Sequence, residues 1–156
     1  MIAECFLDTN ILLYAASRNP AHLSKKTRAI ELIAEKQFAL SAQVLQEFYV
    51  NATKKADFSL KPDIALRWIE NLEEFVCMPV DTALVKTAAV TSVRFGISYW
   101  DGAIVAAAAA IGAPVLYTED LNHGQAYGTV RAINPFLASP AQPGFHENRQ
   151  TALTKD

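Results

Sequence analysis

The sequence predicts an α/β domain: a parallel sheet of about five strands with helices on both of its faces. One observation is that apolar runs of four to six residues alternate with longer amphipathic segments, the pattern of strand–helix–strand units. A second is that 156 residues, 51% hydrophobic and 19% charged, suffice for a single domain with a sizeable core. The expected strands are residues 2–7, 38–41, 75–80, 115–118 and 130–133.

Capping and helix-breaking residues separate these strands from the expected helices. Asp8, at the end of the first strand, is a good N-cap for the helix that follows, and Pro20 breaks that helix. Gly96 is placed to end a later helix, and Ser98 to cap the next one. The expected helices are residues 11–17, 21–35, 43–55, 64–74, 82–95 and 99–111.

The chain is expected to consist of one domain and a tail. Residues 1–137 contain every expected element, and we assign them to a single domain. From Ser139 onward the sequence is polar and contains two prolines. Residues 138–156 are therefore predicted to be a polar C-terminal tail, either mobile or in contact with a partner.

Charge and apolar pattern exclude several classes of protein. The formal net charge of −2 argues against a protein that coats nucleic acid by bulk positive charge, but it is compatible with an enzyme whose acids are screened by bound cations. Cys5 and Cys77 lie in apolar runs and are expected to be reduced, buried thiols. The N-terminus has no basic region, and the apolar run 102–117 is interrupted by Gly112. We therefore expect a soluble, cytoplasmic protein without a signal peptide or a membrane span.

Four acidic residues lie at expected strand ends or beside apolar segments, where a carboxylate points to a structural or functional role. Asp8 and Asp120 each follow an expected strand, at the carboxyl edge of the sheet, where open α/β folds bind ligands. Asp101 is the only charged residue in the stretch 95–118, so its burial would require a partner, a capping role or a metal. Glu47 borders the apolar stripe of its expected helix.

Each of these acids also has an ordinary structural explanation. Asp8 can serve as a helix N-cap, and Asp120 can start an Asx turn. Glu47 can be a solvated surface residue. Asp101 can complete a capping box by reaching back to the N–H of Ser98, and we give this role and a catalytic role equal weight.

As a set, the four acids predict a metal site. Carboxylates that converge at one edge of a sheet repel one another and raise some of their own pKa values. Hard divalent cations that prefer oxygen ligands, Mg²⁺ or Mn²⁺, remove this penalty. Such ions can deprotonate a water molecule and stabilise the leaving oxygen of a phosphodiester.

The order and spacing of the acids resemble those of a known family. Between residue 2 and about residue 136, the chain looks like the PIN-domain nucleases, and most like the VapC-type toxins of bacterial toxin–antitoxin pairs. The motifs that carry the resemblance are Phe6–Asn10, Glu47, Ser98–Asp101 and Thr118–Asp120. The resemblance implies a Mg²⁺- or Mn²⁺-dependent endoribonuclease that acts on RNA, forms a homodimer and is inhibited by a small antitoxin protein.

The resemblance also implies roles for particular residues. The family's catalytic, metal-binding acids correspond here to Asp8, Glu47, Asp101 and Asp120. Thr9 or Asn10 would help to hold the first acid, and Thr118 the last. Many relatives carry another acid two residues beyond Asp120, where this chain has Asn122. An amide oxygen can still bind a hard cation, but it adds no charge.

Nearby basic residues and a histidine have two explanations each. Arg18, Lys54 and Lys55 could contact the RNA backbone, or could simply be solvated residues at helix ends. His123 could shuttle a proton near Asp120, or could be an ordinary loop histidine.

Two other functions compete with a nuclease. An aspartyl-phosphatase would carry a second acid two residues after the first, where this chain has Asn10, and a receiver domain would need a lysine at a strand end, which we do not find. The stronger alternative is a catalytically inactive PIN-like module that binds RNA or a protein. Loss of one of the four acids would favour that alternative, and all four are present.

Overall fold

The computed structural model describes residues 3–137, so the predicted tail, residues 138–156, lies outside the described residues. These residues form an α/β domain around one sheet with the strand order β3-β2-β1-β4-β6-β5. Every pairing is parallel except that of β5 with β6. The strands are β1 (Cys5–Leu7), β2 (Phe38–Ser41), β3 (Val76–Met78), β4 (Val115–Tyr117), β5 (Ala126–Tyr127) and β6 (Val130–Ile133).

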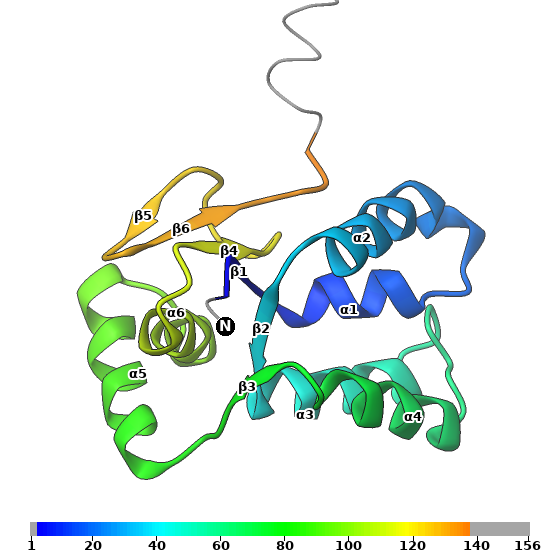
Figure 1. Ribbon diagram of the computed structural model, residues 1–156, viewed down its shortest axis with the longest axis horizontal. Helices are drawn as coiled ribbons and strands as arrows, with labels where there is room; N and C mark the ends of the chain where they lie inside the picture. Colours follow the sequence, from blue (N-terminus) through cyan, green and yellow to red (C-terminus); the bar gives the residue numbers. More distant parts are fainter. Residues whose placement is uncertain (1–2, 138–156) are drawn as a thin grey trace, which may run out of the picture.

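Helices cover both faces of this sheet, as the sequence predicts. Figure 1 shows α1 to α4 on one side and α5 and α6 on the other. The first group packs through α1 on α2 and α3, and α3 on α4, whereas α6 contacts β2, β4 and β6 directly. The helices are α1 (Thr9–Ala16), α2 (Leu23–Glu35), α3 (Ala42–Lys54), α4 (Pro62–Leu72), α5 (Thr82–Phe95) and α6 (Tyr99–Ile111).

Two elements differ from the expectation. The helix expected from residue 21 begins instead with a short 3₁₀ turn, η1 (Pro20–His22), because the Asn19 side chain accepts the Ala21 N–H at 2.9 Å and holds the entry in that shape. The two-residue strand β5 was not expected. It is too short to show a hydrophobic period, and it pairs with β6 through a tight turn in which Gly128 has a φ of 66°.

The core lies where the sheet meets its helices. All of β1 is buried, and Phe6 and Leu7 have no exposed surface. Phe48 from α3 and Leu116 from β4 are equally inaccessible. Burying one such side chain stabilises the fold by roughly 1.5–3 kcal/mol, so the centre of the sheet is a rigid platform for the residues at its edge.

Gly102 allows α6 to pack closely on α5. A Cβ at this position would lie 2.8 Å from the carbonyl oxygen of Ala88 and 2.9 Å from the Cβ of Ser92. Real Cβ atoms do not approach other atoms this closely, so any larger residue would push the two helices apart. Since Asp101 precedes Gly102, this contact fixes where the first turn of α6 lies against α5.

The cysteines agree in part with the expectation. Both are free thiols, and Cys5 is buried, with a pKa that burial raises to about 11. Cys77, in the edge strand β3, is only partly buried. Within residues 3–137, no helix has the length and apolar character that crossing a membrane requires.

Candidate active site at the carboxyl edge of the sheet

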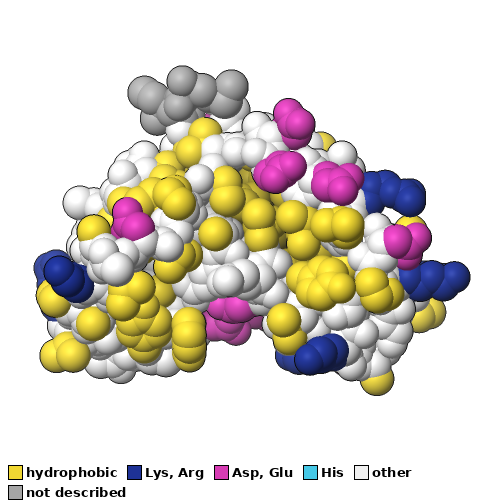
Figure 2. Space-filling model, turned by 90° about the horizontal axis from the view of Figure 1, so that it is seen from below, with side chains coloured by type: hydrophobic (Ala, Val, Ile, Leu, Met, Phe, Trp, Pro, Cys, Tyr) yellow, Lys and Arg dark blue, Asp and Glu magenta, His cyan; other side chains and the backbone are white. Residues whose placement is uncertain are grey.

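The four acids come from four separate elements that meet at the carboxyl edge of the sheet. Asp8 follows β1 and Asp120 follows β4, two neighbouring parallel strands whose last residues, Leu7 and Tyr117, are paired. Glu47 comes from α3, and Asp101 lies in the first turn of α6. Figure 2 shows a hollow between two lobes of the molecule, with acidic side chains in it.

Asp8 is the most buried of the four, with 4% of its surface exposed. Its Oδ1 accepts the Thr9 N–H at 2.7 Å, and its Oδ2 accepts the Thr118 hydroxyl at 2.7 Å. Burial raises the pKa of Asp8 to about 7; these two hydrogen bonds oppose the shift, and the charges of Asp120 and Glu47 add to it. Asp8 is therefore both the N-cap of α1 and a carboxyl group poised between its charged and neutral forms.

Asp120 is held less firmly. Its Oδ2 accepts a hydrogen bond from the Asn10 amide at 3.1 Å, and its backbone N–H donates to the Thr118 hydroxyl at 3.1 Å. The residue as a whole is exposed, but its carboxyl group lies against the protein. Loss of surrounding water and the charge of Asp101 raise the pKa of Asp120.

Glu47 accepts hydrogen bonds from side chains of two helices, α3 and α1. Its Oε1 accepts a hydrogen bond from Gln43 Nε2 at 2.7 Å, and its Oε2 accepts one from the Thr9 hydroxyl at 3.3 Å. The same Gln43 nitrogen donates to the carbonyl oxygen of Trp100 at 3.2 Å. Gln43, which the sequence analysis did not single out, therefore connects Glu47 on α3 to the start of α6.

Asp101 combines a capping position with a place in the acidic group. Its N–H donates to the Ser98 hydroxyl at 3.0 Å, so Ser98 caps α6 as expected. The reciprocal bond from the carboxylate to the Ser98 N–H is absent from the described part of the chain. Burial raises the pKa of Asp101. The side-chain hydroxyl of Ser98 opposes this shift, and the charge of Glu47 adds to it.

The four carboxyl groups influence one another, yet they are not gathered around a single point. Among residues 3–137, no three acidic, histidine or cysteine side chains lie close enough together to hold a metal ion. The oxygen-only donor set nevertheless fits a hard cation, and the Asn10 Oδ1 is buried without a hydrogen-bond partner among the described residues. A cation would thus be held only after Glu47, Asp101 or Asp120 turned toward Asp8, and none of these three is fully buried.

The supporting residues bind the expected acids and other acids as well. Thr9 holds Asp8 through its backbone and Glu47 through its hydroxyl. Asn10, the alternative to Thr9 for the first acid, binds Asp120 instead. Thr118 accepts the N–H of Asp120, the last acid, as expected, and also donates its hydroxyl to Asp8. The pairing of β1 with β4 explains the bonds from Asn10 to Asp120 and from Thr118 to Asp8, because it brings the segments that follow the two strands side by side.

The structure does not bring Asn122 to the acids. It is exposed, and its amide nitrogen donates to Gln125 Oε1 at 2.8 Å within its own loop. His123 accepts the Asn134 N–H at 3.0 Å and so fastens that loop. Arg18 lines a separate cavity, whereas Lys55 borders the site, where its charge lowers the pKa of Asp120 against the larger effects that raise it.

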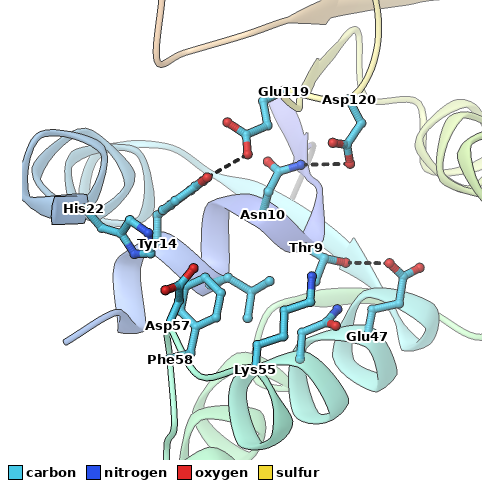
Figure 3. A pocket seen from close by; sticks show the side chains of 12 residues that line it. Thr9, Asn10, Tyr14, His22, Glu47, Lys55, Asp57, Phe58, Glu119 and Asp120 are labelled. Atoms are coloured by element: carbon cyan, nitrogen blue, oxygen red, sulfur yellow. Dashed lines mark hydrogen bonds between the residues drawn. The ribbon is translucent and has the colours of Figure 1, made fainter. Parts of the chain in front are cut away.

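A cavity of about 280 Å³ opens beside the acids; we call it the acidic cavity (Figure 3). It is lined by Thr9, Asn10, Leu13, Tyr14, His22, Glu47, Asn51, Lys55, Asp57, Phe58, Glu119 and Asp120. One end of the cavity carries Glu47 and Asp120, two of the four predicted acids. The other end is lined by the rings of Tyr14, His22 and Phe58.

The comparison with known families agrees with this site and fold. The family model of the PIN domain matches residues 5–128, which include all four acids. The chain belongs to the PIN-domain family. No curated protein sequence matches it significantly.

Solved structures share the fold of this PIN domain at low sequence identity. The toxin VapC20 of Mycobacterium tuberculosis, described as cleaving the sarcin–ricin loop, is 21% identical, with a TM-score of 0.61 over 74% of this chain and 89% of its own. A toxin–antitoxin complex from Klebsiella pneumoniae is 19% identical, with a TM-score of 0.61 over 84% and 97%. DNA-bound VapBC from Salmonella typhimurium is 19% identical, with a TM-score of 0.57 over 86% and 99%.

Two further residues beside the acids of this PIN domain, Tyr14 and Lys25, were not expected from the sequence. The Tyr14 hydroxyl donates to Glu119 Oε1 at 2.8 Å, and Lys25 Nζ donates to Glu119 Oε2 at 2.9 Å and to the Tyr14 oxygen at 3.1 Å. A usable signal existed for Tyr14, which follows Asn10 by four residues and so shares its helix face. Lys25 gives no such signal, because its partner lies 94 residues away.

Proposed function

We propose that this PIN-domain protein is a metal-dependent endoribonuclease and the toxin component of a toxin–antitoxin pair of the VapC type. One observation carries the proposal: four carboxyl groups from separate elements meet at the carboxyl edge of the sheet, where burial, together with repulsion between their charges, raises the pKa of Asp8 to about 7 and also raises the pKa values of Asp101 and Asp120. Such mutual repulsion costs stability unless a cation compensates it. Toxin–antitoxin proteins among the structures of the same fold support the biological role.

Asp8, Glu47, Asp101 and Asp120 are the proposed ligands of Mg²⁺ or Mn²⁺. When bound, such an ion supplies Lewis acidity: it polarises a phosphoryl oxygen and lowers the pKa of a water molecule. Asp8 would anchor the ion, because the Thr9 N–H and the Thr118 hydroxyl already fix both of its oxygens. Asn10 would hold Asp120 in reach of the ion, and the proposal assigns no ligand role to Asn122, whose amide binds Gln125.

The chain's own side chains would orient the RNA and hold the acids in position. Lys55 borders the acidic cavity and is exposed to solvent, so its charge is available to an RNA phosphate outside the cavity. Gln43 would keep Glu47 turned toward the site, since it binds Glu47 and the Trp100 carbonyl together. No side-chain nucleophile is required for this hydrolysis.

A homodimer and a small antitoxin are the proposed partners. Three valines of α5 leave apolar surface open to solvent: Val85, Val90 and Val93 are 42%, 68% and 83% exposed. Exposed apolar surface of this kind marks interaction sites, and a second copy of the chain is the proposed occupant. Action on cellular RNA would place the protein in the cytoplasm.

A catalytically inactive PIN-like module that binds RNA or a protein is the second candidate. It is favoured by one observation, namely that no three potential ligands among residues 3–137 are already gathered for an ion. In that case the acids would serve as caps and hydrogen-bond acceptors, and metal would have no effect on RNA.

The test is RNA cleavage by the purified full chain, freed of any antitoxin. We would incubate it with mixed cellular RNA in Mg²⁺ or Mn²⁺, in EDTA, and as the Asp8→Asn variant, and then map the cut ends. Discrete cuts that require metal and vanish in Asp8→Asn support the nuclease. Cleavage that survives both EDTA and Asp8→Asn contradicts the mechanism, and intact RNA with metal-independent binding supports the inactive module.

A further inference from the structure

We infer that the acidic cavity receives one base of the RNA next to the cut, and that it prefers a base with an exocyclic amino group. This inference rests on the proposed function, because it takes the acids as the place of the scissile phosphate. It names a substrate feature that the acids by themselves do not determine.

The position and size of the acidic cavity suit a single base. Glu47 and Asp120 line it, so it is continuous with the acidic group where the phosphate would be cut. A nucleotide whose phosphate lies there must place its sugar and base close by. The volume, about 280 Å³, falls just below the roughly 300–1,000 Å³ of pockets that enclose drug-sized ligands.

The far wall of the acidic cavity is aromatic. The ring centres of His22 and Phe58 lie 5.4 Å apart, and Tyr14 contacts both rings edge-on at 5.1 and 6.3 Å. All three side chains are only partly buried, and Figure 3 shows them grouped at one end of the cavity. Unpaired RNA bases stack on such rings, and His22 is held in place by a 2.7 Å hydrogen bond with Ser17.

Hydrogen-bond acceptors with few donors or none lie beside the same space. Asn10 is about nine-tenths buried, and its Oδ1 has no hydrogen-bond partner among the described residues, although its amide nitrogen binds Asp120. A buried acceptor without a donor is costly, so a donor from a ligand would be stabilised there. Asp57 adds a carboxylate whose sole donor among residues 3–137, the Asn19 amide, is 3.4 Å away.

These acceptors select among the bases. Adenine, cytosine and guanine each carry an exocyclic amino group, which donates hydrogen bonds, whereas uracil has carbonyl oxygens in the corresponding positions. Asn51, which also lines the cavity, can donate and accept through its amide. The acidic cavity therefore offers acceptors to the exocyclic amino group of these three bases, a contact that uracil cannot make.

Charge argues against a phosphate in the same place. Glu47, Asp57, Glu119 and Asp120 line the cavity, against Lys55 as its one lysine or arginine in the described residues. An anion would be repelled there, while a neutral base would not. A guanidinium group from a protein would also suit this charge, and the experiment is designed to separate the two.

The test uses the full chain in EDTA, so that binding is read without catalysis. Isotope-labelled protein is titrated with adenosine, cytidine, guanosine, uridine and N-acetylarginine amide while the side-chain amide signals of Asn10 and Asn51 are followed by NMR. Phe58→Leu keeps apolar bulk but removes the flat ring. Phe75→Leu is the matched control. Phe75 directly precedes β3 and stacks on Phe38 at the amino edge of the sheet, opposite the edge that carries the acids, and it is 43% exposed.

We expect the three amino-bearing nucleosides to shift both amide signals and to bind more tightly than uridine. In Phe58→Leu the affinity should fall by roughly tenfold or more, since base stacking is lost, whereas Phe75→Leu should bind as the unchanged protein does. Asn51→Ala, which removes no core group, should reduce the discrimination against uridine.

Cut-site mapping on a random RNA pool with Mn²⁺ completes the test. The unchanged protein should prefer an amino-bearing base beside the cut, and Phe58→Leu should flatten that preference while Asp8→Asn abolishes cutting. Cleavage without nucleoside binding, or with a preference that Phe58→Leu leaves intact, overturns the base pocket and leaves the nuclease standing. Nucleoside binding without any cleavage supports the pocket and contradicts the nuclease. Binding of the arginine probe alone overturns the pocket.

Discussion

Asp8 and Asp120 occupy equivalent places in the fold but differ in how firmly they are held. Each follows one of two neighbouring parallel strands. Asp8 is buried, caps α1 and receives a hydrogen bond on each oxygen, whereas Asp120 sits in an exposed turn and receives one bond, from Asn10. One acid of the site is therefore fixed by the core, while the other remains adjustable. The proposed metal site would therefore combine a rigid anchor with movable partners, since no three potential ligands among residues 3–137 are already gathered.

The largest expected effect is on catalysis. Asp8→Asn should abolish metal-dependent RNA cleavage, because the anchor loses its charge. Asp120→Asn should lower the rate less, since the remaining acids can still turn toward Asp8. The rates of both variants are measured on the same RNA, with circular dichroism to check folding. Equal losses in the two variants would break the distinction between a fixed and an adjustable acid.

The next effect is on stability as a function of pH. In the unfolded chain Asp8 releases its proton near its ordinary pKa of 3.8, whereas in the folded protein its pKa is about 7. Between these values the folded state binds more protons, so the free energy of unfolding should fall as pH rises from about 4 to about 7, by up to about 4 kcal/mol. Urea unfolding in EDTA measures this change.

Asp8→Asn is the control for the same measurement. The amide does not titrate, so the variant should lose most of this decline and exceed the unchanged protein in stability at neutral pH without metal. Added Mg²⁺ or Mn²⁺ should stabilise the unchanged protein and leave Asp8→Asn unaffected. Parallel pH profiles for the two proteins would show that Asp8 is not the group responsible.

A smaller effect is expected from substituting Thr118, which links Asp8 to Asp120. The Thr118 hydroxyl donates to Asp8 and accepts the Asp120 N–H, so Thr118→Val should leave two groups unsatisfied. We expect a loss of roughly 1–3 kcal/mol in stability and of about 10–100-fold in cleavage. Thr87→Val, on the exposed face of α5, is the matched control and should change neither. Wild-type cleavage by Thr118→Val would count against this link.

The smallest effect is predicted for Asn122. Its exposed side chain binds Gln125 and contacts none of the four acids in the described residues. Asn122→Ala should therefore change stability by less than about 0.5 kcal/mol and leave the metal dependence of cleavage as it is. A marked rise in the Mn²⁺ concentration needed for cleavage would instead place Asn122 among the groups that hold the ion.

Local sequence signals determined the framework of this protein. Short apolar runs predicted five of the six strands, and the helix ends at Asp8, Gly96 and Ser98 follow from the conformational preferences of those residues. The carboxyl-edge positions of Asp8 and Asp120 follow from the same pattern. These features depend on neighbours along the chain, so one sequence suffices to predict them.

Only the tertiary structure decided which side chains hold which acid. The bonds from Asn10 to Asp120 and from Thr118 to Asp8 each join residues 110 positions apart, and Gln43 reaches Trp100 across 57 positions. The direction in which Asn122 turns, and the aromatic wall beside the acids, likewise depend on how separate elements pack. Such contacts are set by the distance between packed elements, which no local propensity or spacing encodes.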